Sequence, residues 1–137
     1  MAKALIIMKT LLPGEFQWLE ITTVGEINKH PESIVIEYME SPLTGMEKTK
    51  TTMTLKNDDI TIKREGSFQS ELTFAPEASK LCLYSTPYGT VRIKTDTSEY
   101  SLQDRDGEYF LSLNYGLTIE GEYQGETAME MLIQQKE

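Results

Sequence analysis

The sequence predicts an all-β protein, either a sandwich or a barrel built from roughly 8 to 10 antiparallel strands. Runs rich in Val, Ile, Thr and aromatic residues recur along the chain at roughly 8–12-residue spacing. Pro, Gly, Asn and Asp, which favour turns, separate most of these runs. No stretch shows a convincing amphipathic-helix pattern. This many strands can close into a barrel, and closure would remove exposed sheet edges.

The chain begins with an apolar run over residues 4–12 that Lys9 interrupts and that Pro13 and Gly14 end. It superficially resembles a secretory signal, but no cleavage site of small residues follows it. We therefore expect a first strand here, followed by a turn.

The middle of the chain predicts seven further strands. They are expected over residues 16–27, 33–40, 49–56, 60–64, 67–74, 81–85 and 89–95. Asn57, Asp58 and Asp59 form a turn signal between two of these runs, which indicates a hairpin. Residues 76–80 give the best helical candidate, which is about one turn long and is expected to be a loop.

The last third has the clearest alternation of apolar and polar residues, which is typical of a strand with one buried face. Its apolar positions are Leu111, Leu113, Tyr115, Leu117 and Ile119, and the pattern returns at Met129, Met131 and Ile133. The whole chain, residues 1–137, is expected to form one domain.

Charge is spread unevenly over a chain whose 13 Lys and Arg face 22 Asp and Glu, for a net charge of −9. Residues 96–137 carry 10 of the acidic side chains and 2 of the basic ones. This balance argues against nucleic-acid binding through phosphate neutralisation and against attraction to an anionic membrane. No apolar run reaches the roughly 18 residues that a membrane helix needs. The absence of such a run and the lone Cys82, which is expected to be a buried apolar residue, together predict a cytoplasmic protein.

The acidic C-terminal region is most simply a solvated outer face. A docking face for a basic partner is the alternative, and Glu120, Glu122 and Glu126 would carry it. A third interpretation is a calcium loop, although the full EF-hand pattern is missing. Its ligands would be Asp104, Asp106 and Glu108.

Motifs for established chemistries are absent. The chain has no Gly-x-Ser-x-Gly elbow, no P-loop and no dinucleotide fingerprint, so neither a catalytic residue nor a cofactor is predicted. Cys82 and His30 are its only thiol and imidazole, and His30 precedes Pro31 in an expected turn. One histidine and one cysteine also exclude most zinc ligand sets, and no metal is expected. Paired carboxylates keep an enzyme open as a less favoured reading.

Polar residues on otherwise apolar strands are the candidate binding residues. Tyr38 follows Ile34 and Ile36 on one strand face, and Arg64 follows two isoleucines in the same way. Together with Tyr115, and with Thr86 as a fourth member, they would converge on a barrel interior. An inward arginine needs a partner, either a bound anion or a glutamate such as Glu37 or Glu40. The simpler alternative places Arg64 at a strand end, in water or in an ordinary ion pair. Trp18 and the methionines are expected in the core.

Three segments, in this order and spacing, resemble the uncharacterised bacterial YwiB-like family (domain of unknown function 1934). They are residues 63–66 leading to 72–74, residues 86–95, and residues 111–117. The resemblance implies a calycin-like antiparallel barrel of the broad kind seen in lipocalins, with no known activity or ligand residues. In the same segments, Gly66 predicts a turn or bulge with positive φ, and Tyr88 with Gly89 predicts a hairpin turn.

The sequence thus favours a non-enzymatic barrel that binds a small apolar or amphipathic molecule, anionic ligands included, through Arg64, Tyr38, Tyr115 and Thr86. The alternative is a protein-interaction module that uses its acidic C-terminal strands. Self-association as a homodimer through an exposed sheet face is a further expectation.

Overall fold

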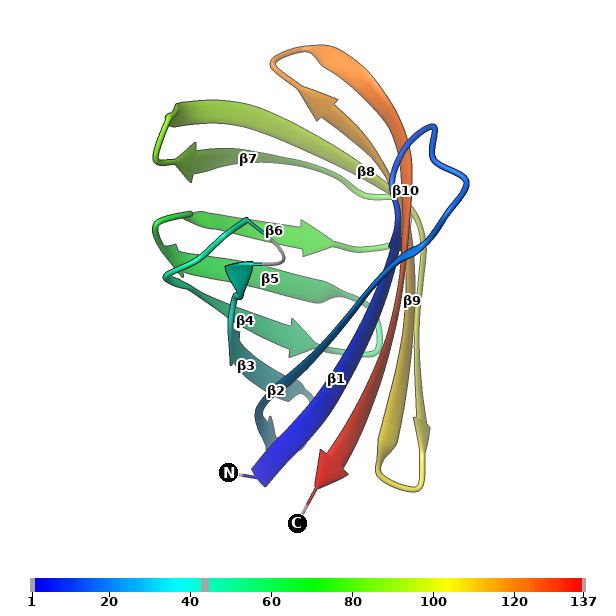
Figure 1. The fold of residues 1–137 in the computed structure, drawn as a ribbon. Coiled ribbons are helices and arrows are strands. Elements are labelled where there is room, and N and C mark those ends of the chain that lie inside the picture. The colour runs from blue at the N-terminus through cyan, green and yellow to red at the C-terminus, as the bar shows by residue number, and fades with distance from the viewer. Residues whose placement is uncertain (1, 43–44, 137) are drawn as a thin grey trace.

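The computed structural model describes residues 2–42 and 45–136, and ten strands account for most of them (Figure 1). In chain order they are β1 (Ala2–Leu11), β2 (Leu19–Lys29), β3 (Ile34–Met39), β4 (Thr49–Leu55), β5 (Ile60–Gly66), β6 (Ser70–Phe74), β7 (Ser79–Thr86), β8 (Gly89–Arg105), β9 (Glu108–Ile119) and β10 (Glu122–Lys136). All paired strands are antiparallel. The expected all-β antiparallel fold is therefore confirmed.

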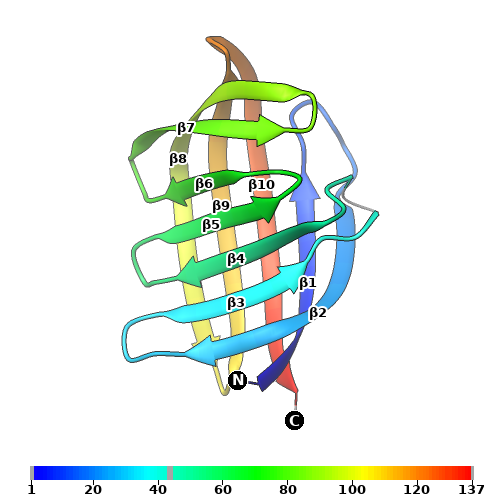
Figure 2. The same ribbon diagram turned by 90° about the vertical axis from the view of Figure 1, so that its left-hand side faces the viewer.

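The strands form one sheet that curls into a nearly closed barrel. Its order is β6-β5-β4-β3-β2-β1-β10-β9-β8-β7, so the first and last strands of the chain lie side by side. Strands β3 to β7 run across the direction of β1, β9 and β10 (Figure 2). The edge strands β6 and β7 meet at one isolated bridge, between Gln69 and Ser85. Closure is incomplete because no continuous ladder joins these two strands.

The core fills the interior because side chains alternate between the two faces of each strand. In β4, for example, the first, third, fifth and seventh residues are buried. Large side chains that are almost fully buried come from both halves of the barrel, namely Ile6, Ile36, Met53, Leu55, Ile60, Phe74, Leu111, Leu113, Met131 and Ile133. Much of the interior is therefore packed core and not an open lumen.

Most predicted strands occur where expected, and three of them differ clearly in extent. Strand β2 begins at Leu19 and strand β6 at Ser70, each three residues later than expected. Strand β8 continues to Arg105, ten residues beyond the predicted end. Its second part is rich in polar residues that face outward, so composition alone hid the strand. The expected first strand, the hairpin between β4 and β5, and the turn at His30 are confirmed.

Trp18 was expected in the core, and this prediction is wrong: 41% of the residue is exposed, because it precedes β2 in the β1–β2 loop. The methionines differ in burial. Met8, Met53 and Met131 are buried as predicted, whereas Met39 is 58% exposed on the outer face of β3. Cys82 is partly buried against the core.

Two glycines lie where the sequence predicted turns. Gly66 has the predicted positive φ, +123°, and Gly89, in the predicted hairpin turn, has φ +138°. Gly89 closes the turn between β7 and β8 after Pro87 and Tyr88. Among the described residues there is no helix that is long and apolar enough to cross a membrane.

Candidate functional site

A row of polar side chains crosses the inner face of four adjacent strands. Tyr38 on β3 pairs with Thr51 on β4, Thr51 pairs with Arg64 on β5, and Arg64 pairs with Ser70 on β6. These four residues, here called the polar row, have the same parity as the buried apolar residues of their strands. The register therefore places an arginine and three hydroxyl groups together at one end of the barrel.

Glu40 supplies the counter-charge of the polar row. Its side chain is 2% exposed, and its Oε2 lies 3.8 Å from Nε of Arg64, whose side chain is 17% exposed. The hydroxyl of Thr51 donates a hydrogen bond to the same carboxylate oxygen. A buried carboxylate requires such partners because desolvation of an unpaired charge is costly. Of the two glutamates weighed as partners for the arginine, Glu40 therefore fills the role.

Glu37 points the other way. Its carboxylate pairs with Nζ of Lys50 at 3.4 Å, and both side chains are more than one third exposed. The alternation along β3 explains the difference, since residues 38 and 40 face inward while residue 37 faces outward.

The two tyrosines lie close to the arginine from opposite walls. The hydroxyl of Tyr38 donates to Sδ of Met8 at 3.6 Å. Burial raises the pKa of Tyr38, the nearby Glu40 carboxylate raises it further, and Arg64 opposes the shift. Burial likewise raises the pKa of Tyr115, and Arg64 again opposes the shift. Both phenols therefore stay protonated at neutral pH and can donate hydrogen bonds.

Tyr115 belongs to a second inward row, which runs from Thr97 on β8 through Tyr115 on β9 to Thr127 on β10. The ring of Tyr115 packs against Phe74 of β6, with 4.6 Å between ring centroids. This contact places the second row against β6, and the charge of Arg64 opposes the rise in the pKa of Tyr115.

Thr86, the fourth candidate residue, uses its hydroxyl within the β7–β8 turn. The hydroxyl donates to the carbonyl of Gly89 at 3.0 Å and accepts from the backbone N–H of Tyr88 at 3.1 Å. The structure thus brings Tyr38, Arg64 and Tyr115 together and assigns Thr86 to the turn.

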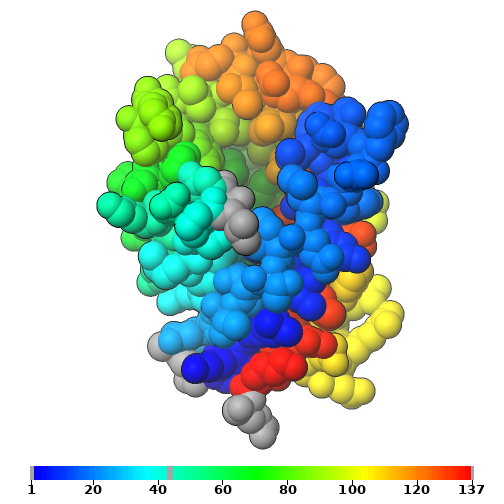
Figure 3. Space-filling model, in the orientation of Figure 1, coloured from blue at the N-terminus to red at the C-terminus, as the bar shows by residue number. Residues whose placement is uncertain are grey.

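A groove gives access to Arg64 at the gap between β6 and β7. It has a volume of about 560 Å³ and is lined by Lys63, Arg64, Glu65, Gly66, Gln69, Ser70, Glu71, Leu83 and Ser85. The molecule is also hollowed at this end, between the blue β1–β2 segment, the cyan residues around β3 and β4, and the orange β9–β10 hairpin (Figure 3).

Several buried polar atoms of this interior have no hydrogen-bond partner among the described residues. They are Nε of Arg64 and the hydroxyls of Ser70, Thr95 and Thr97. Buried polar groups are nearly always hydrogen-bonded, so water or another bound molecule is expected to pair with these atoms.

Two fully buried threonines allow a matched test of this set. Thr51 and Thr95 both have 0% exposure, but only Thr51 bonds a carboxylate, whereas the Thr95 hydroxyl has no partner among the described residues. We expect Thr95→Val to raise the free energy of unfolding by about 1 kcal/mol, because it removes an unpaired polar group. Thr51→Val should lower it by about 2 kcal/mol, because Glu40 loses a charged hydrogen bond. Urea unfolding followed by circular dichroism measures both, and equal effects of the same sign would contradict the assignment.

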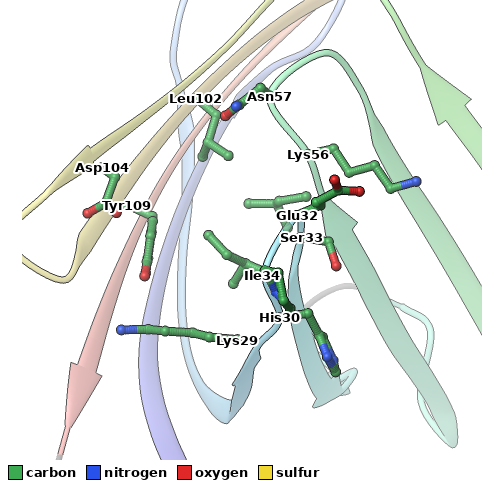
Figure 4. Close-up of a pocket in the computed structure, with 12 residues that line it drawn as sticks. Lys29, His30, Glu32, Ser33, Ile34, Lys56, Asn57, Leu102, Asp104 and Tyr109 are labelled. Atoms are coloured by element: carbon green, nitrogen blue, oxygen red, sulfur yellow. The ribbon is translucent and has the colours of Figure 1, made fainter.

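A second pocket, which no sequence pattern predicted, lies at the opposite end of the barrel. It has a volume of about 350 Å³ and lies between the β2–β3 turn, the end of β4 and the β8–β9 hairpin (Figure 4). Nζ of Lys29 lies 5.5 Å from the centroid of the Tyr109 ring, a cation–π contact. The side chains of His30 and Lys56 point away from the middle of this pocket. Its charged groups therefore converge less than those around Arg64.

Within the described part of the chain, the structure assembles neither a metal cluster nor a pair of buried carboxylates. No group of three His, Cys, Asp or Glu could hold a metal ion there, Asp104, Asp106 and Glu108 included. Among the described residues, Glu40 is the carboxylate that is buried. Cys82 donates its S–H to the carbonyl of Leu83, and His30 lies in the exposed β2–β3 turn. What the interior offers chemically is hydrogen-bond donors and one arginine.

Comparison with known proteins agrees with this fold. The structure superposes on the crystal structure of the ywiB protein from Bacillus subtilis with a TM-score of 0.84 and 17% sequence identity, covering 99% of this chain and 93% of that one. No curated protein matches the chain. The family model for a domain of unknown function, DUF1934, matches residues 9–131. Because this match spans most of the sequence, the chain belongs to the DUF1934 family.

Proposed function

We propose that this protein is a non-enzymatic binding module that holds a small apolar or amphipathic molecule with an acidic head group. The observation that carries the proposal is the state of Arg64. Its guanidinium is largely buried, its Nε has no hydrogen-bond partner among the described residues, and it borders an accessible groove. A guanidinium presents several donors in a planar fork, which suits a carboxylate or phosphate.

Glu40 holds the arginine without using all of its donors. It approaches Nε at 3.8 Å, which is an ion-pair distance and longer than a hydrogen bond. The pair therefore stabilises the buried charge, and the proposal requires the other N–H groups of the guanidinium to bind the acidic group of the ligand.

The surroundings limit the size of the ligand. The buried apolar residues fill much of the barrel, so the ligand would bind at the end of the barrel and not along its length. The volume of the groove lies within the usual range for small-molecule sites. Its head group would meet Arg64 and Ser70, and its apolar part would cover Leu83, which is 64% exposed. We also infer a cytoplasmic location, from the lone cysteine and the acidic composition.

Native mass spectrometry of gently purified protein, compared with the denatured mass, tests for a resident ligand. Octanoate and octanol, titrated by calorimetry, test the head group. We expect octanoate to bind more tightly, and Arg64→Lys to weaken octanoate by about tenfold because lysine lacks the planar fork. Lys94→Gln removes a charge from the outer face of β8 and is the control. No extra mass together with no preference for octanoate, or equal binding by the Arg64 variant, would refute the proposal.

The acidic C-terminal strands favour a second candidate, an interaction module for a basic partner. Glu122 and Glu126 are exposed. Glu120 is not free for this role, because its Oε1 accepts the backbone N–H of Arg92 at 2.8 Å. Charge reversal at Glu122 and Glu126 is therefore the appropriate test, since reversal at Glu120 would also disturb the contact with β8.

A further inference from the structure

The loop between β1 and β2 carries an unusual number of exposed apolar side chains. Phe16 is 98% exposed, Leu12 43% and Trp18 41%, and Leu19, the first residue of β2, is 55% exposed. Exposed apolar residues that gather on one surface are typical of a site that contacts another molecule.

The β9–β10 hairpin extends this surface. Leu11 pairs with Ala128, and Pro13 packs so closely on Gly125 that a Cβ there would lie 2.8 Å from the Cβ of Pro13. Tyr123 lies beside Gly116 and is 65% exposed. The blue loop and the orange hairpin share one side of the molecule (Figure 3). We call this surface the acidic–apolar face, made of Leu12, Phe16, Trp18, Leu19, Tyr123, Glu15, Glu20, Glu122 and Glu126.

The charges of this face are mostly negative. Residues 10–23 and 112–129 contain five glutamates and neither lysine nor arginine, but Lys9 lies opposite Glu20 across the β1–β2 ladder. Glu120 is bonded to the backbone of β8, so Glu15, Glu122 and Glu126 carry the exposed negative charge of the face. A lipid surface with anionic head groups would be repelled here, and a second copy would bring like charges together.

We propose that the acidic–apolar face binds a basic amphipathic segment of another protein, one that places apolar side chains on Phe16 and Trp18 and Lys or Arg beside Glu122 and Glu126. This proposal rests on the second candidate function, the interaction module, and not on ligand binding at Arg64. Burial of the exposed aromatic residues would supply most of the affinity, and the glutamates would select a partner of positive charge.

Trp18 is the single tryptophan of the chain, so tryptophan fluorescence reports on this face directly. The probe is a short peptide of Leu and Lys in helical alternation, compared with a scrambled peptide of equal composition. We expect the amphipathic peptide to shift the emission to the blue and to bind about tenfold more tightly than the scrambled one, with affinity falling as salt rises.

Variants separate the apolar contribution to peptide binding from the electrostatic contribution. Phe16→Ser keeps the reporter and should weaken binding about tenfold, as should the double variant Glu122→Lys with Glu126→Lys. Leu81→Ser on β7 and Glu32→Lys at the opposite end of the barrel are matched controls that should change nothing, since Leu81 is 82% exposed and lies outside the face.

Two results would overturn the inference. If binding depends on Glu122 and Glu126 but not on Phe16, the interaction module stands and the acidic–apolar face is wrong. If neither peptide binds, or if sedimentation shows a dimer that Phe16→Ser dissociates, both the face and its basic partner are wrong.

Discussion

Removing the charge of Arg64 should cost this protein a large part of its stability. We expect Arg64→Met to lower the free energy of unfolding by about 3–5 kcal/mol, because Glu40 would remain buried without its cation. The carboxylate is 2% exposed and lies 3.8 Å from the arginine, so water cannot replace the lost partner without rearrangement. Urea unfolding monitored by circular dichroism gives the difference.

Two further variants show whether the loss comes from the unpaired carboxylate. Arg64→Met combined with Glu40→Gln should recover more than half of the loss, because the buried charge is then absent. Lys50→Met breaks the exposed pair with Glu37 and should cost less than about 1 kcal/mol. If Arg64→Met costs no more than Lys50→Met, then Glu40 and Arg64 do not form the buried pair described above.

Gly66→Ala should also destabilise the protein strongly, by about 3 kcal/mol. Gly66 ends β5 with φ +123°, and an added Cβ would lie 2.2 Å from the carbonyl oxygen of Lys48. Backbone atoms cannot yield as a flexible side chain can, so the β4–β5 ladder would have to shift beside Thr49. The shift in urea midpoint measures the effect.

Gly89→Ala is the matched control for this substitution. Gly89 also has a positive φ, at +138°, but an added Cβ would meet no atom within 4 Å. Its variant should show the backbone strain alone, about 1 kcal/mol. The close approach at Gly66 would be refuted if the two glycine variants lost the same stability.

The polar row explains why stability and binding would be linked at this end of the barrel. The same Arg64 that must pair with Glu40 for folding also lines the groove. Thr95 and Thr97 add buried hydroxyls that lack partners among the described residues, a cost that a packed apolar core would avoid. Natural proteins tolerate such costs most often where function requires them.

The sequence by itself determined the fold class and most of the strands. Alternation of apolar and polar residues is a local property, so the inward faces of β3, β5 and β9 could be read directly from it. For the same reason Tyr38, Arg64 and Tyr115 were identified as inward polar residues, and Glu40 as one of two partners for the arginine. Local patterns did not place Trp18 correctly, because its exposure depends on where β2 begins.

Tertiary structure decided which of these residues meet. The row from Tyr38 through Thr51 and Arg64 to Ser70 depends on the register of three strand pairs, and register is set by turns and packing that single strands do not reveal. The pairing of Arg64 with Glu40, the engagement of Glu120 by Arg92, and the closeness of the β1–β2 loop to the β9–β10 hairpin are likewise contacts between distant segments. They arise only once the barrel curls, because curling brings the end of each strand to a common rim.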